Sequence, residues 1–259
     1  MRVPKPVFLI TRYSLRITNV SHSLLTAYRR FLLLDATAFT IRFMMFQMGL
    51  TQAAGDAGLQ LVAVVVGLGL AIILHEVAHG WAALYLGDPT AKYAGRLSLN
   101  PLSHVDLFGT IILPVVLLIS NAGFVFGWAK PVPVNYYNLK YGKYGPALVA
   151  LAGPATNFVL LIIFGLLARF TADDSALPIL FLTIAATNSI LMMFNLIPVP
   201  PLDGSKILYL FLEKQPDAVI WLEKYGMYIL LALIIFGGGI LSRFVFEPAM
   251  YLVGWVVGH

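Results

Sequence analysis

The sequence contains no cysteine among its 259 residues. That absence excludes disulfide bonds, iron–sulfur clusters and thiolate zinc sites, so any metal centre must use nitrogen and oxygen ligands. Charged residues are also scarce: they make up 11% of the chain, whereas a soluble domain carries about 25%. Apolar residues account for 59%, in runs spread along the whole chain. A separate soluble domain of ordinary size is therefore excluded, and we expect a polytopic membrane protein.

Basic residues outnumber acidic ones, and the formal net charge is +5. In a membrane protein this excess indicates basic cytoplasmic loops, so we expect no nucleic-acid partner. Residues 1–57 form a basic N-terminal extension that lacks the compact apolar core of a cleavable signal peptide. Within it, residues 31–53 are apolar but contain Asp35 and Arg42. A weak membrane helix and an interfacial helix both fit this stretch.

The apolar runs predict an all-α fold with about five to six transmembrane helices. Residues 213–224 are polar and are expected to connect two of these helices. The run around 110–135 is broken by Pro114 and by an Asn-Ala-Gly sequence at 121–123, which are turn signals. The remaining apolar runs cover residues 59–86, 145–169, 177–198, 226–242 and 244–257.

The first clear span contains the pattern H-E-x-x-H, formed by His75, Glu76 and His79. Residues four apart on an α-helix share a face, so both imidazoles can reach one zinc ion. Glu76 beside them can serve as the general base for a water molecule. Strongly polar side chains near the bilayer centre cost about 2.5–3.5 kcal/mol on insertion scales, so they are usually functional. The alternative is a helix whose histidines only hydrogen-bond to their neighbours.

A catalytic zinc site commonly adds a carboxylate to two histidines, and Asp203 is the best candidate for it. Asp203 follows an apolar helix that ends in three prolines, and irregular backbone at membrane depth is tolerated only where it is buried in protein or lines a cavity. Asp-Gly is also ordinary turn chemistry, so Asp203 would equally suit a cap for a helix beginning near Ser205. These residues alone leave both interpretations open.

Three motifs in order resemble the site-2 protease family of intramembrane zinc metalloproteases. They are H-E-x-x-H, A-G-P-x-x-N at 152–157, and N-x-x-P-x-P-P-L-D-G at 195–204. The segments G-R-L-S-L-N-P-L-S-H-V-D and F-G-W-A-K-P-V-P-V-N are similar to a compact prokaryotic branch without PDZ or CBS domains. The chain departs from that pattern at Asp106, which is followed by leucine where the family usually has proline.

The resemblance implies a function and a set of site residues. His75, His79 and Asp203 would bind one Zn²⁺ per chain, and Glu76 would be the catalytic base. Residues 58–259 would form a metalloprotease domain that hydrolyses peptide bonds in or near the transmembrane segments of membrane-protein substrates. These substrates and the lipid bilayer are the expected partners, and a homo-oligomer is possible. It also implies that Asn157 and Asn195 are polar residues near the site. Either could hydrogen-bond the oxyanion or the substrate backbone, although asparagines also join membrane helices by hydrogen bonds.

The depths of His79 and Asp203 in the membrane predict the topology. His79 lies near the end of one span and Asp203 lies beyond the end of another, so the two spans must run parallel to meet at one ion. An odd number of crossings must then separate them, and residues 145–169 supply one. Residues 110–135 should therefore enter the membrane and return as a re-entrant segment. By the positive-inside rule, the motif then faces the cytoplasm, together with Lys92, Arg96, Lys130, Lys140 and Lys143. The resemblance implies that the membrane is that of a prokaryotic cell.

A metal or proton-coupled transporter is the alternative function, because intramembrane His and Asp residues also form transport pathways. Such a transporter would be expected to contain inverted repeats and a second polar stretch at matching depth. The sequence shows no repeat. Transport also gives no reason for Glu76 to follow His75 directly.

Overall fold

A computed structural model describes residues 57–120, 127–171 and 177–258 of the chain. The predicted basic extension at 1–57 lies outside the described residues except for Ala57, as does the whole of the apolar stretch at 31–53. The turn predicted at 121–123 also lies outside them. The described residues form helices and connecting segments, with no strand among them.

Five helical stretches are long and apolar enough to cross a membrane, which confirms the predicted all-α polytopic fold. The five stretches are α3 (Ala57–Tyr85), α6 (Tyr144–Phe170), α7 (Leu177–Asn195), α9 (Pro216–Phe236) and the stretch formed by α10 (Gly238–Leu241), η4 (Ser242–Phe246) and α11 (Glu247–Val257). In the fifth stretch, the helix continues from α10 to α11 through the short π-helix η4. Six shorter elements lie between them: α4 (Thr90–Tyr93), η1 (Pro101–Ser103), η2 (Leu107–Ile112), α5 (Leu113–Ile119), η3 (Tyr136–Asn138) and α8 (Gly204–Phe211).

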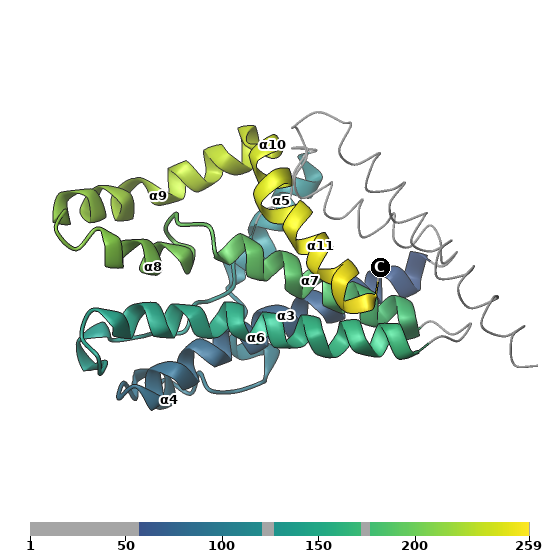
Figure 1. Cartoon of the computed structure of the whole chain (residues 1–259), viewed down its shortest axis with the longest axis horizontal. Coiled ribbons are helices and arrows are strands. Elements are labelled where there is room, and N and C mark those ends of the chain that lie inside the picture. Colours follow the sequence, from purple (N-terminus) through teal and green to yellow (C-terminus); the bar gives the residue numbers. More distant parts are fainter. Residues whose placement is uncertain (1–56, 121–126, 172–176, 259) are drawn as a thin grey trace, which may run out of the picture.

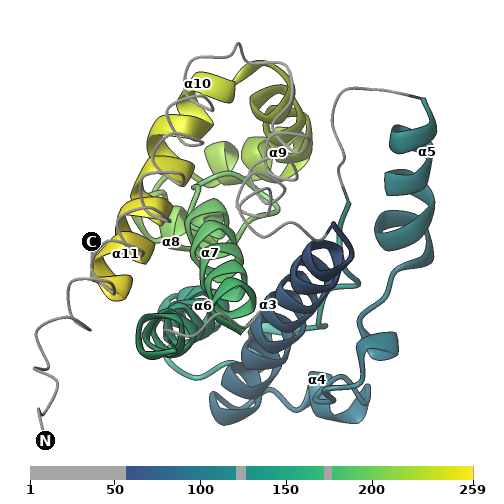
Figure 2. The same ribbon diagram turned by 90° about the vertical axis from the view of Figure 1, so that its right-hand side faces the viewer.

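Helices α3, α6 and α7 pack together at the centre, and α11 lies against α6 and α7 (Figures 1 and 2). The buried part of α7 is unusually small and polar, with Thr183, Ala186 and Asn188 each 2% exposed or less. Ser189 Oγ on the same helix donates a hydrogen bond to Ala249 O on α11 at 2.9 Å. Small residues and hydrogen bonds are what join helices in a membrane, where lipid removes the hydrophobic drive for association.

Helix α9 starts at Pro216, earlier than the predicted apolar run at 226–242, and ends at Phe236. The expectation that residues 213–224 would be only a connection was therefore wrong for most of that stretch. Proline suits the first position of a helix, and Asp217 in the first turn favours the start electrostatically. The polar composition is accommodated because Glu223 accepts hydrogen bonds from two residues of α8, Lys206 Nζ at 2.6 Å and Tyr209 Oη at 2.8 Å.

Residues 127–138, the returning segment, lie at the end of the bundle where η2 begins, as the predicted topology requires. The N–H of Trp128 donates to Gly109 O at 3.1 Å, and Thr110 Oγ1 donates to Trp128 O at 2.8 Å. A side chain at Gly109 would come within 2.4 Å of the Trp128 ring, so only glycine permits this approach. In Figure 2, α5 stands apart from the central helices.

Asp88 fixes the returning segment against the end of α3. This fully buried carboxylate accepts hydrogen bonds from Thr90 Oγ1 at 2.5 Å, the Asn135 N–H at 2.7 Å and Asn138 Nδ2 at 3.0 Å. Burial raises the pKa of Asp88, but these hydrogen bonds outweigh it and hold the pKa below its usual value. The charged form is therefore the one that secures residues 135–138 beside α3.

Candidate metal centre

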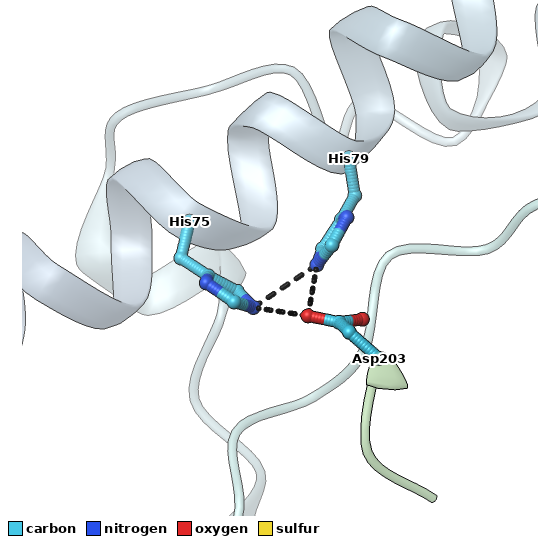
Figure 3. Close-up of side chains that lie close together, drawn as sticks. All are labelled: His75, His79 and Asp203. Carbon is cyan, nitrogen blue, oxygen red and sulfur yellow. Dashed lines mark hydrogen bonds and ion pairs between the residues drawn. The ribbon is translucent and has the colours of Figure 1, made fainter. Parts of the chain in front are cut away.

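Three predicted ligands come together at one point. His75 and His79 lie one turn apart on α3, and Asp203 immediately precedes α8 (Figure 3). The two histidine Nε2 atoms are 3.0 Å apart, and Asp203 Oδ2 lies 3.1 Å from His75 Nε2 and 3.3 Å from His79 Nε2. Within the described ranges, this is the only group of three His, Cys, Asp or Glu side chains arranged to hold a metal ion.

The donor atoms fit a zinc ion. Ligands placed about 2.0–2.1 Å from a tetrahedral zinc are separated from one another by about 3.3 Å, close to the distances between His75, His79 and Asp203. Asp203 Oδ2 is buried and accepts no hydrogen bond. Two imidazole nitrogens and a carboxylate oxygen that converge this closely suit a bound cation, and the N and O ligand set suits Zn²⁺.

The capping alternative for Asp203 was wrong. Asp203 does occupy the N-cap position of α8, but its side chain makes no capping hydrogen bond. The N–H groups of Ser205 and Lys206 donate instead to the carbonyls of Leu202 and Asp203 at 3.1 and 3.0 Å. The Asp203 carboxylate is therefore free to point toward the histidines of α3, as Figure 3 shows.

Helix α6 contacts both histidines through Val149 and Asn157. His79 Nδ1–H donates to Val149 O at 2.8 Å, which leaves the Nε2 lone pair facing Asp203. Asn157 is fully buried, and its Nδ2 atom lies 3.2 Å from His75 Nδ1 while its Oδ1 has no partner. Rotating this amide by half a turn lets Oδ1 accept from His75 Nδ1–H and frees His75 Nε2 for a metal.

Gly153, also on α6, lies directly against the two imidazoles. A β-carbon at this position would lie 2.5 Å from His79 Nε2, 2.5 Å from His75 Cε1 and 2.6 Å from His75 Nε2. Distances below 3.0 Å are essentially never seen for real β-carbons, so no other residue fits without movement. Sequence reasoning missed this role, for which the only signal was the position of the glycine within A-G-P-x-x-N.

The other two predicted residues make different contacts. Glu76 is partly buried, and its Oε2 accepts a hydrogen bond from the Val132 N–H of the returning segment at 3.0 Å. Asn195 is partly exposed, and its Nδ2 donates to Leu191 O of its own helix at 3.0 Å. The structure thus brings Asn157 against a candidate ligand and leaves Asn195 bonded within α7.

Similarity to known proteins extends over most of the chain. Residues 170–237 match the model of peptidase family M50. YwhC of Bacillus subtilis is 38% identical over 181 residues, covering 66% of this chain and 79% of YwhC. Rip2 of Mycolicibacterium smegmatis is 30% identical over 200 residues, covering 75% of this chain and 72% of Rip2. Both relatives are named for an inferred zinc metalloprotease activity. No solved structure matches the chain significantly.

Proposed function

The chain belongs to peptidase family M50, and we propose that this multi-pass membrane metalloprotease cleaves peptide bonds in or near the transmembrane segments of membrane proteins. The observation that supports the site of cleavage is the placement of the candidate ligands. His75 and His79 belong to an apolar helix that is long enough to span a bilayer, and Asp203 joins them from just beyond the end of another. A substrate would therefore meet the site within or beside the membrane.

In this peptide hydrolysis, the metal and Glu76 would have separate roles. Zinc held by His75, His79 and Asp203 would polarise the scissile carbonyl and activate a water molecule. Glu76 would accept the proton of the attacking water and return it to the leaving amine. Its carboxylate is next to His75 in the chain, and Oε1 accepts no hydrogen bond from the described residues. That oxygen is available for the proton.

Two asparagines receive separate roles. Asn157 would hold the tautomer of His75, because it is fully buried and its amide touches the imidazole nitrogen that faces away from Asp203. Asn195 would contact the substrate backbone or the oxyanion, because its side chain is partly exposed at the end of α7. Its present hydrogen bond to Leu191 lies within its own helix and can be exchanged.

The proposed orientation places the active-site end toward the cytoplasm of a prokaryotic cell. Basic residues follow both α3 and the returning segment at that end, as the positive-inside rule requires. The N–H of Lys140, for example, donates to Leu86 O at 2.8 Å, just after α3 ends. Asp173 and Asp174, which connect α6 to α7 in the sequence, would lie on the opposite side.

Cleavage by the purified protein in detergent tests this function. We expect a labelled single-span substrate to be cut within or beside its apolar segment, with all activity lost on zinc chelation and restored by added Zn²⁺. A soluble peptide that carries the same cleavage sequence without the apolar segment is the control, and we expect little cutting of it. Equal cutting of both substrates would contradict the intramembrane assignment. Zinc binding without cleavage of any of a panel of membrane substrates would favour the transporter alternative.

A further inference from the structure

The returning segment contacts the proposed base through one backbone group. We propose that Arg96 and the peptide that joins Pro131 to Val132 form a clamp that orients the Glu76 carboxylate for proton transfer. The inference rests on the proposed function, because it assigns positioning roles around the base of that reaction. Neither Arg96 nor Val132 is a metal ligand or a proton carrier in it.

The sequence around Val132 explains why a single N–H serves Glu76. Proline has no N–H, holds φ near −65° and disfavours helix at the residue before it. Pro131 and Pro133 therefore keep this stretch extended and leave the N–H of Val132 as the only donor between them. That N–H donates to Glu76 Oε2 at 3.0 Å.

Gly80 on α3 allows the segment to approach this closely. A β-carbon at Gly80 would lie 3.2 Å from Val132 Cγ1 and 2.5 Å from Leu97 Cδ2. The Val132 side chain is buried, so its backbone is fixed on one side by this packing. The contact between Val132 and Glu76 is thus part of a packed interface with α3.

Arg96 holds the same peptide from its other side. Its side chain is buried, and Nη2 donates to Lys130 O at 2.5 Å and Pro131 O at 3.2 Å, while Nη1 donates to Ser103 O. Pro131 C=O and Val132 N–H belong to one planar peptide group. The Arg96 guanidinium therefore donates to the oxygen of the same peptide group whose N–H donates to the Glu76 carboxylate.

This arrangement strengthens the contact to Glu76. Hydrogen bonds in a chain polarise one another in a low-dielectric interior, and bonds to charged groups are about twice as strong as neutral ones. No carboxylate forms an ion pair with Arg96 within the described residues, so its charged hydrogen bonds go to backbone carbonyls, that of Pro131 among them. The clamp fixes Oε2 and leaves Oε1 as the oxygen that carries the proton.

Removing the single donor tests the proposal. Val132→Pro deletes the N–H while preserving an extended backbone, and Val134→Pro is the matched control because the Val134 N–H forms no hydrogen bond in the described part of the chain. We expect Val132→Pro to lower kcat about tenfold to hundredfold, with KM and bound zinc unchanged. Val134→Pro should keep the wild-type kcat. An unchanged kcat in Val132→Pro, a rise confined to KM, or a faster enzyme would each overturn the clamp.

Arg96 provides a second test that does not depend on the first variant folding. Arg96→Lys keeps the charge but has a single donor nitrogen, whereas Arg96→Gln removes the charge. We expect Arg96→Gln to lose about tenfold in kcat at full zinc occupancy and Arg96→Lys to recover much of that loss. Equal kcat values for wild type and both variants would overturn the proposal. Failure of the proposed function is a separate result, since then the wild type itself would cut no membrane substrate.

Discussion

Glu76→Gln is expected to lower cleavage of a single-span substrate by about a hundredfold to ten-thousandfold while zinc stays bound. Glutamine has the shape of glutamate but cannot take a proton from water, and general-base catalysis contributes about this factor. Its amide oxygen can still accept the Val132 N–H, so the surrounding backbone should not move. Time courses of substrate cleavage and the zinc content of the same samples measure both effects.

Glu213→Gln is the matched control for this loss of a carboxylate. Glu213 is exposed and pairs with Lys143 at 2.5 Å, and an exposed ion pair contributes little to stability. We expect this variant to cut at the wild-type rate. A Glu76→Gln protein that retained most of the wild-type rate would remove Glu76 from its proposed role, whatever its zinc content.

Gly153→Ala is expected to release most of the zinc. The new methyl group would lie 2.5 Å from His79 Nε2 and from His75 Cε1, so either α6 must move or both imidazoles must turn. A metal site tolerates displacements of about 0.5 Å, and this change is larger. Changes to groups that merely orient ligands cost about tenfold to hundredfold in metal affinity, and a direct clash should cost at least as much. Competition with a chelator of known affinity measures the loss.

Gly69→Ala is the control for adding a methyl group to a membrane helix. A β-carbon at Gly69 on α3 would have no neighbour within 4 Å, so it changes helix propensity without a clash. We expect Gly69→Ala to bind zinc as tightly as the wild type and to unfold at the same or a higher temperature. Equal zinc affinity in Gly153→Ala would show that α6 does not confine the histidines as the structure indicates.

The spans and the candidate ligands followed from the sequence because they depend on local patterns. Apolar runs located the five spans in the described part, and the four-residue spacing of His75 and His79 requires only helical geometry. The role of Asp203 did not follow from a local pattern, because an Asp-Gly sequence is equally compatible with a turn cap and with a metal ligand. The resemblance and the depth argument favoured the ligand, and the structure places its carboxylate beside both imidazoles.

Other features could not be predicted because they depend on how distant segments pack. The clash that excludes a side chain at Gly153 exists only once α6 lies against α3. The hydrogen bonds that connect Arg96 to Glu76 pass through backbone groups of a third segment, and backbone groups are the same whatever the side chains, so no residue pattern predicts these bonds. The early start of α9 was missed because its polar first turns are paired with α8 by tertiary contacts.

Zinc content of the purified wild type and of Asp203→Ala tests the central claim most directly, namely that His75, His79 and Asp203 together hold one metal ion. Asp217→Ala is the control, because Asp217 is an exposed acid in the first turn of α9. We expect one zinc per chain in the wild type and in Asp217→Ala, and little or none in Asp203→Ala. Full zinc occupancy in Asp203→Ala, or no bound zinc in the wild type, would contradict it.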